Sequence, residues 1–169
     1  MRACRLLAAR ATVFSVLGAD EMRFDCFKKA LNHEVFEKND AIALPYDDRK
    51  RSRGKGISEK GAAVAWFLER GEYLRGGDVL VSTTDNLFSI KARPEPVSRV
   101  TTTDNFALTR IAYHLGNRHV ALEVREDELL YQPDYVLDQM VIGLGGLVDE
   151  LVSPFQPEDG AYHAHPKHQ

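Results

Sequence analysis

The histidines are the residues of this chain whose type and spacing most clearly suggest chemistry. Two lie five positions apart in mid-chain and three fall within the last seven residues; they are His114, His119, His163, His165 and His168. Imidazole is a common ligand of transition metals and is largely neutral at pH 7, so it is free to coordinate. We therefore expect His119 and the tail histidines to share a metal ion.

The elements around His114 and His119 keep the two side chains apart. Asp104 can cap a helix whose apolar stripe, at 3/4 spacing, is made by Leu108, Ile111, Ala112 and Leu115. We expect Gly116 to end this helix in the left-handed conformation. His119 then precedes a strand over residues 120–124 and lies on its wetter face, so it does not form a helical chelate with His114. We expect His114 to pack or to orient the loop.

A single chain offers one well-placed folded ligand, whereas a divalent ion needs about four. A two-fold homodimer that brings His119 near its axis supplies a second copy. The tail can add His163 or His165, with His168 and His114 as weaker candidates. Such a site is exposed and labile, which suits delivery of a metal. The alternative is a structural histidine that hydrogen-bonds a backbone carbonyl, the commoner role of a lone histidine after a helix.

The pattern along the chain changes once. Short apolar runs separated by Gly and Asn over residues 40–93 indicate a small all-β unit. Pro94-Glu95-Pro96 marks a boundary, because two prolines cannot lie inside a central strand. The order beyond it is β-α-β-β-α-β, the ferredoxin-like arrangement with two helices on one face of a sheet. We expect the second helix to begin at Pro133 and end at Gly145-Gly146. Its apolar stripe is made by Val136, Leu137, Met140, Val141 and Leu144.

These signals predict an α+β chain in four parts. Residues 1–32 form an N-terminal extension and residues 33–94 a β-rich domain. Residues 95–153 form the ferredoxin-like domain, which is followed by a flexible histidine-containing tail over 154–169. The first residues are rich in Arg and poor in acids but lack a clear cleavage site, so we interpret them as an extension or an upstream start before Met22.

Composition narrows the function classes. The net charge of −3 provides no overall attraction to nucleic acid, and no run of about 18 apolar residues could span a membrane. Cys4 and Cys26 do not form a disulfide framework and fit the reducing cytoplasm. No Gly-x-Ser-x-Gly or His-Glu-x-x-His motif is present, so we expect no enzyme. The alternative is a metal-dependent enzyme with a labile site. Metal-dependent turnover by the purified protein would favour that alternative.

A basic run from Arg49 to Lys55 raises a second alternative. Five cations in seven residues could bind phosphates in an RNA- or protein-binding module. However, Asp47 and Asp48 precede the run, and no RNP-like aromatic motif accompanies it. A solvated loop, or a surface for an acidic protein partner, is therefore the favoured interpretation.

Four stretches of this chain resemble the UreE family of urease accessory nickel metallochaperones. They are Leu44-Pro-Tyr-Asp-Asp-Arg-Lys-Arg-Ser-Arg53, Leu68-Glu-Arg-Gly71 with Leu74-Arg-Gly-Gly-Asp-Val-Leu80, Tyr113-His-Leu-Gly-Asn-Arg-His119, and Pro154-Phe-Gln-Pro-Glu-Asp-Gly-Ala-Tyr162 before the tail histidines. They occur in order and cover residues 33–169. The last two are highly specific as a pair.

The resemblance implies a partner-binding β domain and a dimerising ferredoxin-like domain, with Ni(2+) bound at the dimer interface around His119 and completed by tail histidines. It implies transfer of nickel, with the UreG-type urease accessory GTPase, into apo-urease; imidazole ligands would also accept Cu(2+) or Zn(2+). Some members carry further histidines where this chain has Gln132-Pro-Asp-Tyr135, so that auxiliary site is not expected here. Three tail histidines indicate one site per dimer and no reservoir.

Overall fold

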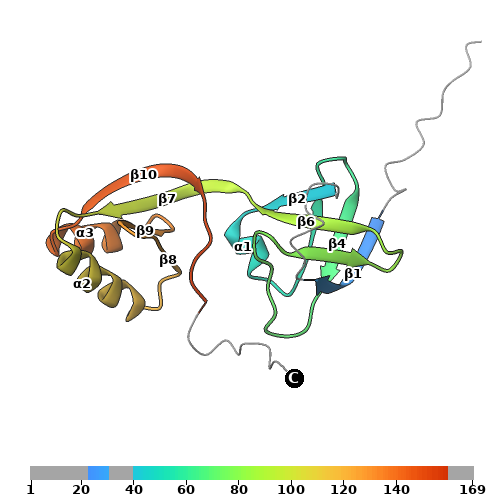
Figure 1. The fold of residues 1–169 in the computed structure, drawn as a ribbon, viewed down its shortest axis with the longest axis horizontal. Coiled ribbons are helices and arrows are strands. Elements are labelled where there is room, and N and C mark those ends of the chain that lie inside the picture. The colour runs from blue at the N-terminus through green and yellow to red at the C-terminus, as the bar shows by residue number, and fades with distance from the viewer. Residues whose placement is uncertain (1–22, 31–39, 160–169) are drawn as a thin grey trace, which may run out of the picture.

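The computed structural model describes residues 23–30 and 40–159, which form two β-sheets side by side along the long axis of the molecule (Figure 1). Each sheet has its own hydrophobic core. The chain passes from the first sheet to the second between β6 (Leu87–Ala92) and β7 (Pro94–Thr101). Outside the described residues lie Cys4, His33, His163, His165 and His168.

The first sheet contains six strands in the described part of the chain. Besides β6, its elements are β1 (Arg23–Ala30), β2 (Asp40–Leu44), the four-residue helix α1 (Tyr46–Arg49), β3 (Arg53–Ile57), β4 (Ala63–Phe67) and β5 (Val79–Ser82). The strand order is β2-β6-β5-β1-β4-β3. The two edge strands approach each other, since the amide just beyond β3, at Glu59, donates to the Ala41 carbonyl at 2.8 Å. The nearly closed sheet confirms the predicted all-β fold of this region.

Strand β1 lies in the middle of this sheet, parallel to β4 and antiparallel to β5. Its residues fall within the stretch 1–32 that the sequence analysis sets apart as an extension. The available signal is a short alternation in which Phe24 and Cys26 face the core, while Arg23 and Asp25 form an exposed ion pair. Such a short alternation is a weaker sequence signal for a strand than the apolar runs of β4 and β5. The segment becomes a strand because it pairs with both of these neighbours.

Trp66 on β4 fills the centre of the first core and is 1% exposed. Its indole N–H donates to the Arg51 carbonyl at 3.1 Å. The ring lies directly against the backbone of Gly54 on β3, where an added Cβ would be 2.2 Å from a ring carbon. A side chain at this position would therefore displace the tryptophan, which explains why an edge strand carries a glycine here.

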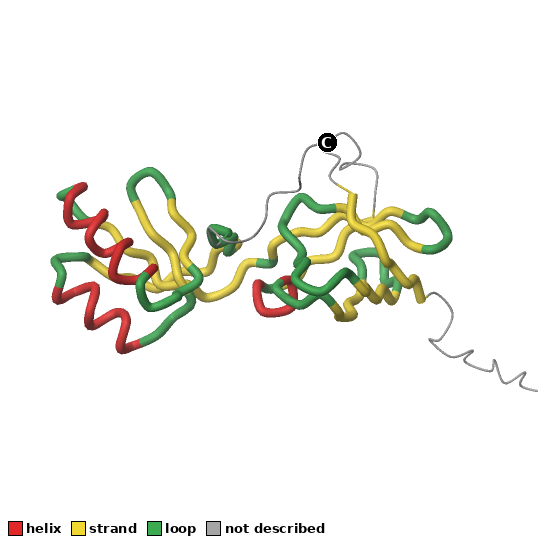
Figure 2. The backbone as a smooth tube through the Cα atoms, turned by 90° about the horizontal axis from the view of Figure 1, so that it is seen from below, coloured by secondary structure: helices red, strands yellow, loops and turns green. Residues whose placement is uncertain are grey.

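The second sheet has the order β10-β7-β9-β8, and both helices lie on one of its faces (Figure 2). After β7 come α2 (Asn105–Gly116), β8 (Leu122–Val124), β9 (Glu128–Tyr131), α3 (Tyr135–Gly143) and β10 (Leu147–Pro154). This arrangement confirms the ferredoxin-like prediction. Neither helix, nor any other in the described residues, is long and apolar enough to cross a membrane.

Asp104 caps α2 as predicted, because its carboxylate accepts from the Phe106 amide at 2.9 Å. The predicted start of α3 at Pro133 is wrong by two residues. Asp134 is the N-cap, and its carboxylate accepts from the amides of Val136 and Leu137. Val136 is also absent from the core that holds the other members of its predicted stripe, because the 3/4 spacing from Leu137 onward defines the buried face.

The prolines at the start of β7 occupy positions where the sheet has only one neighbour. Pro94 and Pro96 pair with Pro154 and Val152 of β10. Strand β9 joins the other side of β7 only from Ser98 onward. The missing N–H groups of the prolines therefore break no ladder between two strands.

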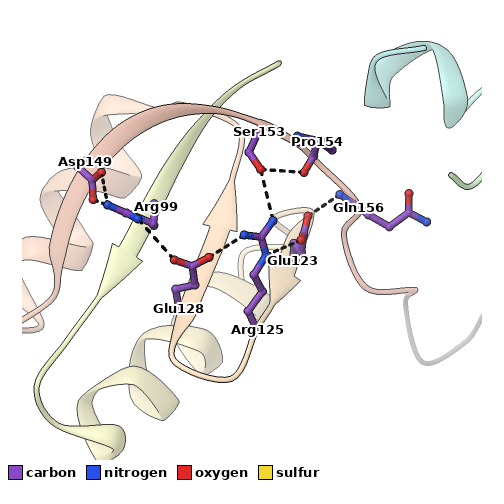
Figure 3. Close-up of polar contacts among 8 residues, drawn as sticks. All are labelled: Arg99, Glu123, Arg125, Glu128, Asp149, Ser153, Pro154 and Gln156. Carbon is purple, nitrogen blue, oxygen red and sulfur yellow. Dashed lines mark hydrogen bonds and ion pairs between the residues drawn. The ribbon is translucent and has the colours of Figure 1, made fainter. Parts of the chain in front are cut away.

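The sheet face opposite the helices carries a chain of opposite charges (Figure 3). Arg99 pairs with Asp149 at 2.8 Å and approaches Glu128 at 3.9 Å. Glu128 pairs with Arg125 at 2.7 Å, and Arg125 pairs with Glu123 at 2.8 Å. Sheets that bind RNA usually present exposed aromatic side chains for base stacking. This face carries paired charges at these positions in place of exposed aromatic side chains, which counts against RNA binding.

The contact between Trp66 and Gly54 predicts opposite effects of alanine at two glycines. Gly54→Ala should lower the free energy of unfolding by about 1–3 kcal/mol through overpacking. Gly116→Ala should raise it by about 0.5–1 kcal/mol, because Gly116 is helical and a Cβ there would meet no atom within 4 Å. Urea denaturation of both variants measures the difference. Equal stability of the two would contradict the described packing.

Burial raises the pKa of the Cys26 thiol to about 11, with the nearby Asp25 carboxylate adding to the effect. The native thiol should therefore stay protonated, and in a Cys4→Ser background it should react with thiol reagents at pH 8 only on unfolding. Between pH 9 and 11 the unfolded chain loses this proton more readily than the native chain. The free energy of unfolding should therefore fall across that range, relative to a Cys26→Ala control. Rapid native labelling would contradict the burial.

Candidate functional site

His119 is the left-handed residue that ends α2, with φ of 56°. Its amide donates to the Gly116 carbonyl at 2.9 Å, and the amide of Val120 donates to the Leu115 carbonyl at 3.3 Å. These two bonds define a Schellman motif with His119 at the C′ position. The prediction that Gly116 adopts the left-handed conformation is therefore wrong. Gly116 is the last residue of α2, and residues 117 and 118 continue the turn until His119 adopts the left-handed conformation.

The end of α3 shows what usually occupies this position. The amides of Gly145 and Gly146 donate to the carbonyls of Ile142 and Val141 in the same pattern. The left-handed residue there is Gly145, with φ of 91°. A residue with a Cβ costs about 1–2 kcal/mol in this conformation. The chain therefore holds a histidine where glycine is favoured, and such a position is a reason to look for function.

His119 belongs to the helix end and not to the strand that follows it. His119 is exposed, and the following strand β8 begins only at Leu122, so the strand parity that we expected does not apply to it. The face expected to be wetter is in fact partly covered, because Ala121 packs against a small core of Val97, Leu130 and Phe155. His119 projects from a helix end that two backbone hydrogen bonds and the buried Leu115 hold in place.

His114 lies in the last turn of α2 and is half-buried. Its ring stands edge-on to that of Tyr113, with the ring centroids 5.4 Å apart. His114 and His119 thus come from different parts of the helix end and form no helical i, i+4 pair. The supporting role expected of His114 stays a prediction.

His119 lines a cleft of about 740 Å³ between the two sheets. The first sheet contributes residues of α1 and of the loop after β4, including Lys50, Glu72 and Tyr73. Pro157, Glu158 and Asp159, which follow β10, line the same cleft. Within residues 23–30 and 40–159, no three His, Cys, Asp or Glu side chains are arranged to hold a metal ion. His119 therefore has no second and third candidate ligand beside it in the described part of one chain.

The flexible tail expected from residue 154 does not begin there. We call residues 155–159 the strap, because they bind both sheets. Phe155 is fully buried and its ring meets that of Tyr46 edge-on. The amide of Gln156 donates to Glu123 at 2.5 Å, and the amide of Glu158 donates to the Leu122 carbonyl at 2.8 Å. Composition alone indicated flexibility because these partners lie far away in the sequence.

The basic run is not a uniformly solvated loop. Arg49 is only 2% exposed, so it cannot contact a phosphate backbone, and the RNA-binding alternative loses one of the cations on which it depended. Arg53 and Lys55 are exposed on strand β3. Arg49 was not among the predicted site residues, because nothing in the sequence distinguishes it from its basic neighbours.

Comparison with known proteins decides the family. The model for the UreE urease accessory protein C-terminal domain matches residues 95–169, and the model for the UreE N-terminal domain matches residues 29–93. The chain belongs to the UreE family. The urease accessory protein UreE of Teredinibacter turnerae is 45% identical over 139 residues, which are 82% of this chain and 90% of the relative. UreE of Tolumonas auensis is 47% identical over 124 residues, 73% of this chain and 66% of that protein.

Membership of the UreE family makes the chain an accessory chaperone of urease maturation and not an enzyme, as the sequence analysis expected. The family is consistent with nickel handling. In this chain the matched C-terminal region contains both His119 and the strap.

The left-handed geometry of His119 predicts an unusual order of stabilities. His119→Gly should be more stable than His119→Ala by about 1 kcal/mol, because only glycine adopts positive φ without a Cβ penalty. Arg118, whose φ is not positive, serves as the control: there the alanine variant should be the more stable of the pair. Urea denaturation of the four variants tests this. The same order at both positions would contradict the assigned conformation.

Proposed function

We propose that this chain is a cytoplasmic, homodimeric nickel carrier. It binds Ni(II) at a dimer-interface site built on His119 and delivers the ion for assembly of the urease nickel centre. The observation that carries the proposal is an exposed imidazole held at a glycine-favouring helix end, in a chain of the UreE family. The rigid backbone orients the ligand, while its exposure leaves the ion accessible to a receiving protein.

The requirement for a dimer follows from ligand number. One imidazole cannot hold a divalent ion tightly, and a two-fold axis near His119 places a second imidazole opposite the first. The helices that flank this end of the sheet expose large apolar side chains which a monomer would not bury: Phe106 is 69%, Tyr113 68%, Tyr135 76% and Val136 72% exposed. Large apolar side chains exposed on both helices favour an interface on this face.

The tail can complete the coordination. The strap ends at Asp159 in the cleft that His119 lines, and His163 follows four residues later. Four residues span at most about 14 Å, so His163 and His165 are within reach of the cleft. His168 and His114 are weaker candidates. Imidazole ligands bind Cu(2+) at least as well as Ni(2+) and also accept Zn(2+), so selectivity for nickel would depend on availability and partners.

Delivery requires partners that accept the ion. The accessory role of the UreE family supports contacts with the urease maturation machinery. We propose the UreG-type GTPase and apo-urease as these partners. A site formed by two side chains at an interface, with further ligands from the tail, releases its ion more readily than a closed four-ligand site within one fold.

Calorimetric titration with nickel tests the site. His119→Gly should weaken the tightest binding event by about 100-fold or more, equivalent to ~2.7 kcal/mol. Glycine is the preferred replacement because it keeps the helix end intact. Truncation after Tyr162 should weaken binding to a smaller extent. His114→Ala removes a weaker candidate ligand and should reduce the affinity far less than His119→Gly does.

The stoichiometry supplies the second readout. We expect one tight nickel ion per two chains, with a dimer in sedimentation equilibrium before nickel is added. The central assignment is wrong if His119→Gly binds nickel as the parent does.

A further inference from the structure

Arg49 is a buried charge that the proposed metal site does not use. Its guanidinium donates to three acceptors: the Leu44 carbonyl at 3.1 Å, the side-chain oxygen of Gln156 at 2.8 Å and the Phe155 carbonyl. None of the acceptors is a carboxylate, and no ion pair of Arg49 occurs among the described residues. Burial lowers the pKa of the guanidinium, although Glu95 and Tyr46 partly oppose the effect.

The geometry of these bonds suits arginine alone. A planar fork of donors can reach a main-chain carbonyl on its own sheet and two acceptors on the strap together, whereas a lysine ammonium is a single point charge. Buried charges contribute little net stability compared with a well-packed apolar residue. The need to fill the junction between the sheets therefore does not explain why an arginine is present. Its hydrogen bonds to the strap do explain it, because they specify the path of the strap.

Beyond Arg49, the strap makes further contacts with each of the two sheets. The side-chain oxygen of Gln156 also accepts from the Gly76 amide of the first sheet at 3.1 Å. Its backbone amide donates to Glu123 of the second sheet, the last member of the charge chain in Figure 3. Asp159 then binds Arg75 at 2.5 Å and accepts from the Tyr73 hydroxyl. Asp159, Tyr73 and His119 all line the same cleft.

We propose that Arg49 is a positioning residue for metal binding. It anchors the strap so that the histidine-containing tail starts beside His119. The tail's contribution to nickel affinity then depends on the first sheet, although that sheet supplies no ligand. The inference rests on the proposed function in one respect, namely that the tail histidines contribute to binding.

A double-mutant cycle separates this role from a purely structural one. Arg49→Lys keeps the charge but loses the fork. In the full chain it should lower nickel affinity at least tenfold, to about that of the chain truncated after Asp159. In the truncated chain the same substitution should change affinity less than twofold, because no tail remains to be positioned. Arg51→Lys, at an exposed arginine with a 3.8 Å ion pair to Asp48, is the matched control and should have no effect in either background.

A second readout needs no metal. Hydrogen exchange of the Gln156 and Glu158 amides, which donate to Glu123 and Leu122, should be faster in apo Arg49→Lys than in the parent. Exchange in the middle of α2 should be unchanged. If Arg49→Lys does not fold, Gln156→Ala removes the same contact from the strap side, where the side chain is only half-buried, and should reproduce both results.

The outcomes distinguish the two proposals. An equal loss of affinity with and without the tail, or unchanged exchange of the strap amides, overturns the role of Arg49 while leaving the His119 site intact. If truncation after Asp159 leaves nickel affinity of the parent unchanged, the tail ligands of the proposed function are wrong, and the positioning role is overturned with them.

Discussion

The antiparallel pairing of β7 with β10 is the constraint on which the arrangement of the site depends. β7 begins directly after the first sheet, and β10 runs back along its whole length, from Leu147 opposite Thr101 to Pro154 opposite Pro94. The chain therefore leaves the second sheet where it entered, at the junction between the sheets. Only this return brings the strap against the buried Arg49 and lets both sheets line one cleft.

The helix end at His119 would suit the presentation of the metal ligand that we propose. A loop side chain would have to be ordered when the metal binds, at an entropic cost. The Schellman bonds fix the backbone of His119 before any metal is present, and the buried Leu115 and half-buried Val120 hold the turn against the core. The left-handed backbone offsets part of this gain. The equivalent residue of α3 is Gly145, which adopts the conformation without a Cβ penalty.

The junction between the sheets combines a small apolar cluster around Phe155 with a set of hydrogen bonds. Arg49, Gln156 and Glu123 form a continuous set of hydrogen bonds that crosses from α1 to β8 through the strap. Glu123 is also paired with Arg125, which links the junction to charges on all four strands of the second sheet. Groups on both sheets therefore define the position of the strap. The strap follows both domains in the sequence and connects them through these hydrogen bonds.

Local patterns in the sequence determined the family, the ferredoxin-like order and the cap at Asp104, and they singled out His119 as a candidate ligand. These features depend on residues within a few turns of one another, where periodicity and capping preferences act directly. The tertiary structure decided the rest. Arg49 and Gln156 are 107 positions apart, so no local pattern can show that one is buried and the other ordered. Strand β1 owes its conformation to two neighbours, and His119 takes the left-handed position because Leu115 and Val120 must both reach the same core.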